Sequence, residues 1–228
     1  LLIALAYTFI SGLRASVITD VVQVAMIFAI GLIILPLTLS AAGGVSAIYA
    51  GLGGLSGVQN IFDPGIAFSL GIVTSIGLIA GALSDQQYWQ RSFAIRRKEL
   101  PKAFIFGALL FVVVPIALST LGFIAANSSV GIALPEGVDV SMIGVQTVAM
   151  LLPSWAVFLF VIMLLAGLSS TLDSGLSAAS SLWVTDVVRP KTDAKAIFSA
   201  RKAMIGIAFL GLLVALAVVY IPQFGLFH

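Results

Sequence analysis

Long apolar runs, separated by short groups of polar and charged residues, make up most of the chain. The uncharged runs are long enough to match the roughly 20 residues that a helix needs to cross the hydrocarbon core of a bilayer. The pattern predicts an all-α membrane protein, a helical bundle of five full transmembrane helices preceded by one truncated helix. We expect these helices over residues 1–10, 16–40, 65–90, 102–126, 153–186 and 196–221.

The charged residues divide the connections between these helices into two kinds. All eleven Lys and Arg residues lie in alternate connections or in the first turns of the helices that follow them, after the first, third and fifth helices. The connections 41–64 and 127–152 carry only acidic charges, at Asp63, Glu136 and Asp139. Because Lys and Arg concentrate in cytoplasmic loops, we expect these two connections to face outside. Their glycines and other turn residues leave room for short surface helices near 45–55 and 139–150.

The composition excludes a water-soluble globule. Of the 228 residues, 61% are hydrophobic and 9% charged, and the mean hydropathy is +1.19. Soluble domains are about half apolar and roughly a quarter charged, so this chain has too little polar surface to coat one. The net charge of +2 comes from short loops, where membrane topology accounts for it. We therefore expect the lipid bilayer, and no nucleic acid, as a partner.

Counts of reactive side chains exclude most familiar catalysis. The chain has no cysteine, and its one histidine is His228. Disulfides, thiolate metal sites and histidine clusters are therefore excluded. We expect neither an enzyme nor a bound organic cofactor. Because the chain starts inside an apolar stretch, without Met or a basic leader, we interpret it as an internal fragment of a longer protein.

Three ionisable residues qualify as lying at membrane depth, where a charge in lipid is costly and is by default a functional hypothesis. They are Asp20, Asp85 and Asp173. Asp20 and Asp85 have an alternative interpretation as interfacial residues near helix ends, and a helix N-terminus would also favour Asp20. Asp173 lies deeper and fits that interpretation less well.

The helix at 153–186 contains an oxygen-rich segment. The adjacent hydroxyls of Ser170 and Thr171, with the carbonyl one turn earlier at Gly167, form a set of neutral oxygens that suits Na⁺, a hard cation. The alternative is a packing stripe, because small residues recur on one helix face and let another backbone approach. That stripe contains residues 167, 170, 174, 178 and 181.

A dense polar cluster ends the helix at 65–90. The cluster runs from Ser84 to Arg91 and contains Asp85, Gln86 and Gln87. Broken helices with polar groups at membrane depth hold substrate in transporters. An aromatic and basic belt that anchors a helix end at the interface is the alternative interpretation.

Three segments carry motifs in a fixed order, and together they span nearly the whole chain. They are Tyr7-Thr8 with Gly12-Leu13-Arg14-Ala15 and Thr19-Asp20-Val21-Val22-Gln23; Asp85-Gln86 with Gln90-Arg91; and Ser169-Ser170-Thr171-Leu172 with Thr185-Asp186-Val187. In this order and spacing they resemble the signatures of the sodium/solute symporter family. The resemblance implies a LeuT-like inverted-repeat fold. Residues 1–228 would then form one incomplete transporter domain that lacks flanking helices at both ends.

The resemblance also implies roles for individual residues. Ser170 and Thr171 match the hydroxyl pair that ligates sodium in the family, and Gly167 matches the carbonyl ligand. Asp20 matches an acidic position on the route of sodium to the cytoplasm. Asp85 falls where family members contact substrate, and Gln87 near an aromatic inner-gate position of sugar carriers. Because Gln87 is not aromatic, a sugar is disfavoured. The first core helix of the family, which contributes further ligands, is missing from the chain.

The expected function is therefore sodium-coupled symport of a small polar solute by alternating access, with Na⁺ as the coupling ion. We expect a multi-pass protein of the bacterial inner (plasma) membrane. A solute sensor, with the same membrane fold joined to a signalling domain, is the alternative, and a membrane enzyme is a remote third. Amino acids, sugars, carboxylates and urea-like solutes all remain open as substrates.

Overall fold

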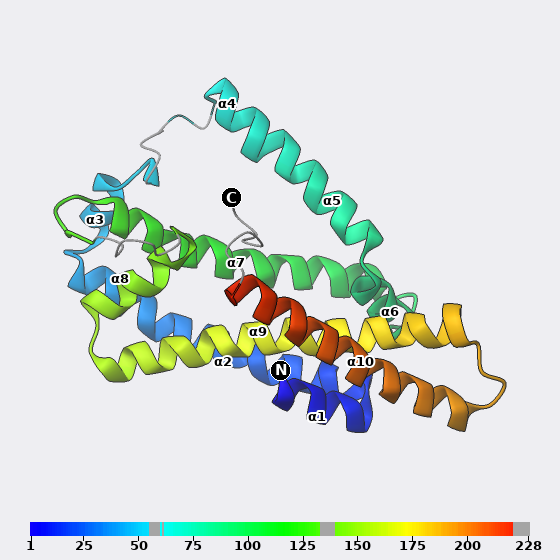
Figure 1. The fold of residues 1–228 in the computed structure, drawn as a ribbon. Coiled ribbons are helices and arrows are strands. Elements are labelled where there is room, and N and C mark those ends of the chain that lie inside the picture. The colour runs from blue at the N-terminus through cyan, green and yellow to red at the C-terminus, as the bar shows by residue number, and fades with distance from the viewer. Residues whose placement is uncertain (55–59, 61, 133–139, 221–228) are drawn as a thin grey trace. The chain divides into compact units, whose positions relative to one another are not determined.

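The structure, a computed structural model, describes residues 1–54, 60, 62–132 and 140–220. In these ranges the chain is helical and contains no strand (Figure 1). The positions Glu136, Asp139 and His228, on which the loop and histidine arguments drew, lie outside the described residues. The helices are α1 (Leu2–Ser11), α2 (Leu13–Ala41), α3 (Val45–Ala50), α4 (Pro64–Ile66), η2 (Ala67–Val73), α5 (Thr74–Ser84), α6 (Gln86–Ala94), α7 (Leu100–Ala126), η3 (Val140–Met142), α8 (Ile143–Leu151), α9 (Ser154–Leu182), η4 (Trp183–Val188) and α10 (Asp193–Tyr220).

Five helical stretches of the described chain are long and apolar enough to span a membrane, which confirms the predicted number of full spans. Two shorter apolar helices occur at Leu2–Ser11 and Val140–Leu151. The first corresponds to the predicted truncated helix. The second and the short helix α3 lie where surface helices were predicted. The spans are Leu13–Ala41, Pro64–Ser84, Leu100–Ala126, Ser154–Val188 and Asp193–Val218.

Two predicted boundaries are wrong. The expected connection at 11–15 is reduced to Gly12, whose φ of 54° ends α1, so that Arg14 lies in the first turn of α2. The helix expected over 65–90 stops at Ser84, and α6 begins at Gln86. Asp85 causes this interruption locally, since its side-chain Oδ1 accepts the Gln87 backbone N–H at 2.8 Å in the manner of a helix N-cap.

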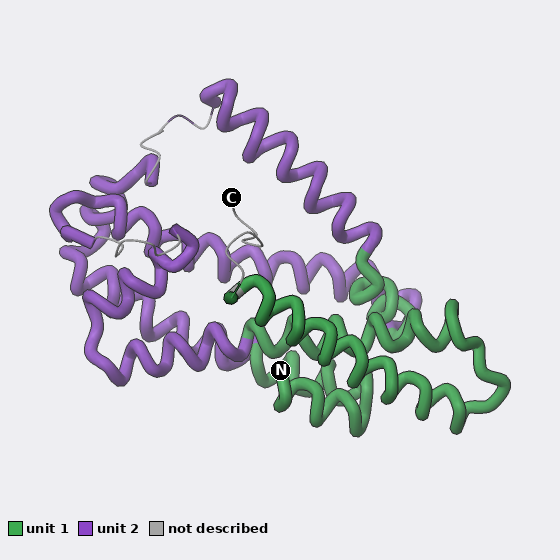
Figure 2. The backbone as a smooth tube through the Cα atoms, viewed as in Figure 1, with its two compact units in different colours: residues 1–23, 85–94, 167–228 green, residues 24–84, 95–166 purple. Residues whose placement is uncertain are grey.

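The backbone divides into two compact units (Figure 2). Unit 1 contains Leu1–Gln23, Asp85–Ala94 and Gly167–His228, and unit 2 contains Val24–Ser84 and Ile95–Ala166. The helices α2 and α9 each contribute one part to each unit.

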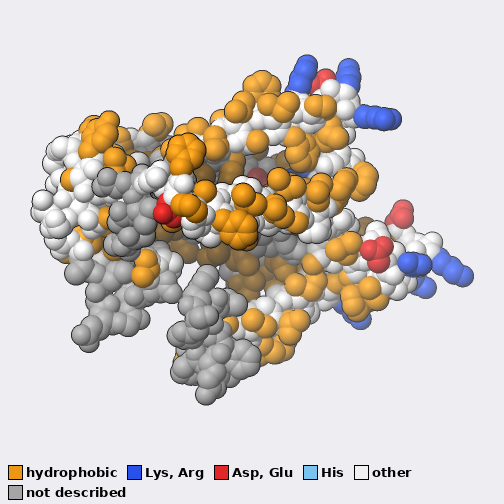
Figure 3. Space-filling model, turned by 90° about the horizontal axis from the view of Figure 1, so that it is seen from above, with side chains coloured by type: hydrophobic (Ala, Val, Ile, Leu, Met, Phe, Trp, Pro, Cys, Tyr) orange, Lys and Arg blue, Asp and Glu red, His pale blue; other side chains and the backbone are white. Residues whose placement is uncertain are grey.

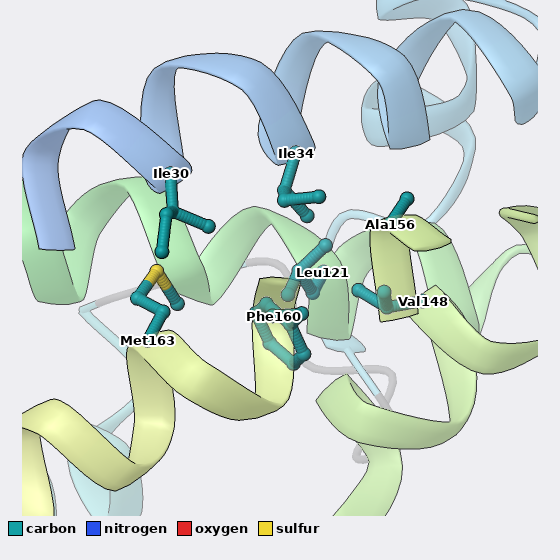
Figure 4. Close-up of a cluster of buried hydrophobic side chains, with 7 residues drawn as sticks. All are labelled: Ile30, Ile34, Leu121, Val148, Ala156, Phe160 and Met163. Carbon is teal, nitrogen blue, oxygen red and sulfur yellow. The ribbon is translucent and has the colours of Figure 1, made fainter. Parts of the chain in front are cut away.

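Unit 2 has an apolar core. Helices α2, α7, α8 and α9 meet around a buried cluster that is closed by Phe160 and Met163 (Figure 4). Most other large apolar side chains in the described residues are exposed, because lipid is their solvent in a spanning helix. The cluster consists of Ile30, Ile34, Leu121, Val148, Ala156, Phe160 and Met163.

Unit 1 differs in that polar residues supply much of its interior. Asp173 and Ser16 are both 0% exposed, and Ser174 is 4% exposed. The short helix α1 packs on α10, where the Arg201 guanidinium lies 5.2 Å from the Phe9 ring centre and Nε donates to the Phe9 carbonyl at 3.2 Å. On the face shown in Figure 3, hydrophobic side chains cover much of the surface, and Lys and Arg side chains gather in small groups at its edge.

The topology can be tested with introduced cysteines, because the chain has none of its own. In the intact protein, Ser46→Cys and Ser128→Cys are expected to react with an impermeant maleimide added outside cells. Lys98→Cys and Lys191→Cys are expected to react only after permeabilisation, since they lie in basic connections. All four side chains are exposed. The reverse labelling pattern would contradict the predicted orientation.

Candidate sodium and solute site

The interior of unit 1 is a polar cluster built from one face of each of three helices. On α9 the face consists of Ser170, Asp173, Ser174 and Ser177, at the i, i+3, i+4 and i+7 spacing of one helix side. On α2 the corresponding face is Ser16, Thr19 and Asp20, and on α6 it is Gln87, Gln90 and Arg91. We call these residues, with Tyr7 of α1, the polar cluster.

Asp173 is a fully buried member of the polar cluster, and hydroxyl groups surround its carboxylate. Oδ1 accepts from Ser16 at 2.7 Å and from Ser174 at 3.1 Å, and Oδ2 accepts from Tyr7 at 2.5 Å and from Thr19 at 3.2 Å. The Thr19 hydroxyl is shared with the carbonyls of its own helix. Asp173 therefore ties α1 and α2 to α9 by hydrogen bonds alone.

Asp20 joins the three helices from the other side of the cluster. One carboxylate oxygen accepts the hydroxyl of Ser170 on α9, and the other lies 2.7 Å from the Arg91 guanidinium on α6. The same guanidinium nitrogen donates to the Ser174 hydroxyl at 2.5 Å. Arg91 thus supplies the cation of the polar cluster. The side chains of Arg91 and Asp20 are 28% and 20% exposed.

Helix α6 lies against α9 through its amide side chains. Gln90 exchanges hydrogen bonds with Ser177, whose hydroxyl donates to Gln90 Oε1 at 3.3 Å and whose carbonyl accepts from Nε2 at 3.4 Å. A Cβ on Gly175 would stand 4.0 Å from the Gln87 Nε2, so a glycine at 175 leaves ordinary contact distance for this amide. Asp85, Gln86 and Gln87 are half-buried at the start of α6.

The three oxygens predicted to bind sodium lie on adjoining sides of α9. The Thr171 hydroxyl donates to the Gly167 carbonyl at 3.2 Å. Neighbouring positions of a helix point about 100° apart, so the Ser170 side chain leaves α9 in a different direction from that of Thr171. Its hydroxyl contacts Asp20 instead. Thr171 is exposed and lines a groove of about 600 Å³ between α9 and α10, beside Gly175, Gly211 and other small or apolar residues. Neutral oxygens and a nearby carboxylate are donor types that suit Na⁺.

Comparison with known proteins decides the class of the protein. The model of the sodium:solute symporter family matches residues 1–228. The chain belongs to the sodium:solute symporter family. No curated protein and no solved structure matches it. Members of the family are transporters and not enzymes, and they couple the movement of a small solute to sodium. With its five apolar helices, the transporter is an integral, multi-pass membrane protein.

The transporter contains cluster residues to which the sequence analysis assigned no role. Ser16 was not singled out, and Tyr7 and Thr19 appeared only within family motifs. The signal that would have found Ser16 and Thr19 is their spacing from Asp20, which places all three on one face of α2. The stripe 167, 170, 174, 178 and 181 describes the small residues of α9 but omits Asp173 and Ser177, which carry its polar contacts.

Proposed function

We propose that the transporter carries a small polar solute across the bacterial inner membrane together with Na⁺, by alternating access. In this proposal residues 1–228 belong to one transporter domain with a LeuT-like inverted-repeat fold. Further helices of the same protein, including the first core helix, complete it. No covalent chemistry is involved, and the sodium gradient does the work.

Sodium binds in this proposal to the Gly167 carbonyl and to the hydroxyls of Ser170 and Thr171. The observation that carries the assignment is the placement of Ser170, whose hydroxyl is held by the Asp20 carboxylate within the polar cluster. A hydroxyl that faced the lipid would be a poor ligand for an ion, whereas the Ser170 hydroxyl lies beside the carboxylate of Asp20. Thr171 and Gly167 supply two further oxygens that already lie 3.2 Å apart.

Asp20 is the first group that sodium would meet on leaving Ser170, in agreement with a role on the route to the cytoplasm. One of its oxygens is already paired with Arg91 at 2.7 Å. A carboxylate that shares its charge with a guanidinium binds a passing cation less tightly than a free one would. Arg91 therefore favours release of sodium over trapping.

Asp85, Gln86 and Gln87 are the proposed solute contacts. They open α6 directly after the helix break, where side-chain carboxylate and amide groups can offer both donors and acceptors. One oxygen of Asp85 caps the Gln87 N–H. Such a set suits a polar solute that carries its own donors and acceptors.

The sodium gradient is large enough for this task. One elementary charge that crosses a potential of 100 mV releases about 2.3 kcal/mol. At about 1.4 kcal/mol per factor of ten, the potential alone supports a solute gradient of about 50-fold for one Na⁺ per solute.

Uptake into proteoliposomes by the intact transporter tests the proposal. Amino acids, sugars, carboxylates and urea-like solutes are screened with and without an inward sodium gradient. With the transported solute, Ser170→Ala and Thr171→Ala are each expected to raise the half-saturating sodium concentration by about tenfold, the cost of one lost oxygen contact. The half-saturating solute concentration at saturating sodium should change much less.

Matched controls come from the same stretch of helix. Ser180 and Thr185 have the same side chains, and within the part of the chain that the structure describes their hydroxyls bond only to the carbonyls of Ser177 and Leu182 in the preceding turn. Ser180→Ala and Thr185→Ala should leave the sodium dependence as it is. Equal sodium dependence in all four variants would refute the ligand assignment, and sodium-independent uptake would refute the coupling itself.

A further inference from the structure

Helices η4 and α10 run side by side at the basic connection that joins them (Figure 1). Arg189 ends η4 in the left-handed conformation, with a φ of 46° and its N–H bonded to the Val184 carbonyl at 2.9 Å. Pro190 follows, a residue that interrupts helices. Residues 189–192 then lead directly into α10. Because this connection is short, η4 and α10 stay in contact at its end of the span.

A groove of about 330 Å³ lies between η4 and α10, and it has a polar and an apolar end. The exposed ammonium of Lys202 and the hydroxyl of Ser199 lie nearer the basic connection. Gly206 and Ile207 lie about one turn further along α10, toward the middle of its apolar span. The groove belongs wholly to unit 1, and its lining residues are Trp183, Ser199, Lys202, Ala203, Gly206 and Ile207.

The polar end of the groove carries positive charge that its neighbours do not balance. The Lys202 ammonium lies 4.5 Å from the centre of the Phe198 ring, and within the described ranges of the chain it belongs to no ion pair. From residue 186 to residue 202 the sequence has five basic and two acidic residues, an excess of three positive charges. This end of the groove therefore attracts anions.

The apolar end of the groove indicates which anion fits. A small free anion would use Lys202 and Ser199 and leave the surface from Ala203 to Ile207 unused. A phospholipid has a phosphate for the first pair and acyl chains for the second surface. Trp183 lines the groove as well, and tryptophan is enriched at the headgroup level of a membrane. Basic pockets between transmembrane helices on the cytoplasmic side bind anionic headgroups.

We propose that the groove between η4 and α10 is a binding site for an anionic phospholipid of the cytoplasmic leaflet. The phosphate contacts the Lys202 ammonium and the Ser199 hydroxyl, and one acyl chain lies over Gly206 and Ile207. A Cβ on Gly206 would meet nothing within 4 Å, so the backbone leaves this surface open to a lipid chain. The inference goes beyond the proposed function and uses none of the proposed sodium or solute ligands.

Quenching of Trp183 fluorescence by brominated lipids tests the proposal, because bromine quenches tryptophan only on contact. The intact transporter is placed in phosphatidylcholine vesicles with increasing shares of brominated phosphatidylglycerol or brominated phosphatidylcholine. The Trp183 signal is the difference from Trp183→Phe. We expect half-maximal quenching at a share of phosphatidylglycerol at least about fivefold lower, since one lysine near a membrane surface attracts an anionic lipid by about 1 kcal/mol.

Two variants act on the two ends of the groove. Lys202→Gln removes the charge and is expected to bring the two lipids within about twofold of each other. Gly206→Phe fills the open apolar surface and is expected to weaken quenching by phosphatidylglycerol. The matched controls are Lys102→Gln and Gly107→Phe, near the start of α7, where a Cβ on the glycine also meets nothing within 4 Å. Both controls should keep the wild-type preference.

Several outcomes would overturn the lipid site. They are equal quenching by the two lipids in the wild type, a preference that survives Lys202→Gln, and an equal loss of preference in Lys102→Gln. Absence of Trp183 quenching by either lipid would mean that another helix of the intact protein covers the groove. Displacement of the lipid by inorganic phosphate would identify a free anion as the ligand instead. Sodium-independent uptake would refute the proposed function and leave this inference standing.

Discussion

Arg91→Gln is expected to lower sodium-driven uptake more than tenfold and to destabilise the transporter by about 1–3 kcal/mol. The substitution leaves the Asp20 carboxylate without its guanidinium partner, and removal of one partner from a partly buried ion pair leaves the other charge uncompensated. The full cost for a buried pair is about 3–5 kcal/mol, but these side chains are 28% and 20% exposed, so solvent screens part of it. Thermal unfolding in detergent and uptake rates measure the two effects.

A double variant tests whether the effect of Arg91→Gln comes from the unpaired charge of Asp20 or from the loss of the arginine side chain. Arg91→Gln combined with Asp20→Asn removes one charge of each sign, so it should recover stability relative to Arg91→Gln alone. Arg97→Gln, at an exposed arginine six positions along the chain, controls for loss of a basic residue. Strictly additive effects of the Arg91 and Asp20 substitutions would show that the ion pair contributes nothing.

Gly51→Ala is expected to have the largest effect on stability within unit 2, about 3 kcal/mol or more. Gly51 ends α3 where it passes over the last turns of α7. A Cβ at this position would stand 1.8 Å from the Phe123 carbonyl oxygen and 2.8 Å from its carbonyl carbon. Because backbone atoms cannot rotate away as a side chain can, α3 has to move off α7. The fraction of monodisperse protein on size exclusion and the unfolding temperature measure the loss.

Gly122→Ala is the control for this substitution. Gly122 precedes Phe123 in α7, and a Cβ there meets nothing within 4 Å. Alanine is also the better helix former, so this variant should be neutral or slightly stabilising. If Gly51→Ala were tolerated as well as Gly122→Ala, the close approach of α3 to α7 would be wrong.

The spans were predictable from the sequence because one strong physical rule sets them. A helix in lipid must pair its own backbone groups and present apolar side chains, so hydropathy alone locates α2, α7 and α10 to within a few residues. Local hydrogen bonds and backbone conformation set the helix boundaries that hydropathy did not predict. Asp85 interrupts an apolar helix by capping the next one, and Gly12 ends α1 without any loop.

The sequence predicted some of the residues of the candidate site, but not which of them contact one another. The cost of charge in lipid singled out Asp20 and Asp173. Nothing in the linear order states that Asp20 meets Ser170, 150 positions away, or that Arg91 turns inward to pair with Asp20. Serine and threonine are common packing residues in membrane helices, so Ser16 carried no signal until its neighbours on α2 and α9 were known.

The hydroxyl-lined interior of unit 1 implies an unusual thermodynamic signature. Soluble domains owe their large positive heat capacity of unfolding, about 12–15 cal/mol/K per residue, to apolar surface that becomes hydrated. Here most large apolar side chains of the described residues already face outward, and the groups around Asp173 are polar. Calorimetry in micelles should therefore give a much smaller heat capacity change, and the stability curve should be nearly straight, with no denaturation on cooling.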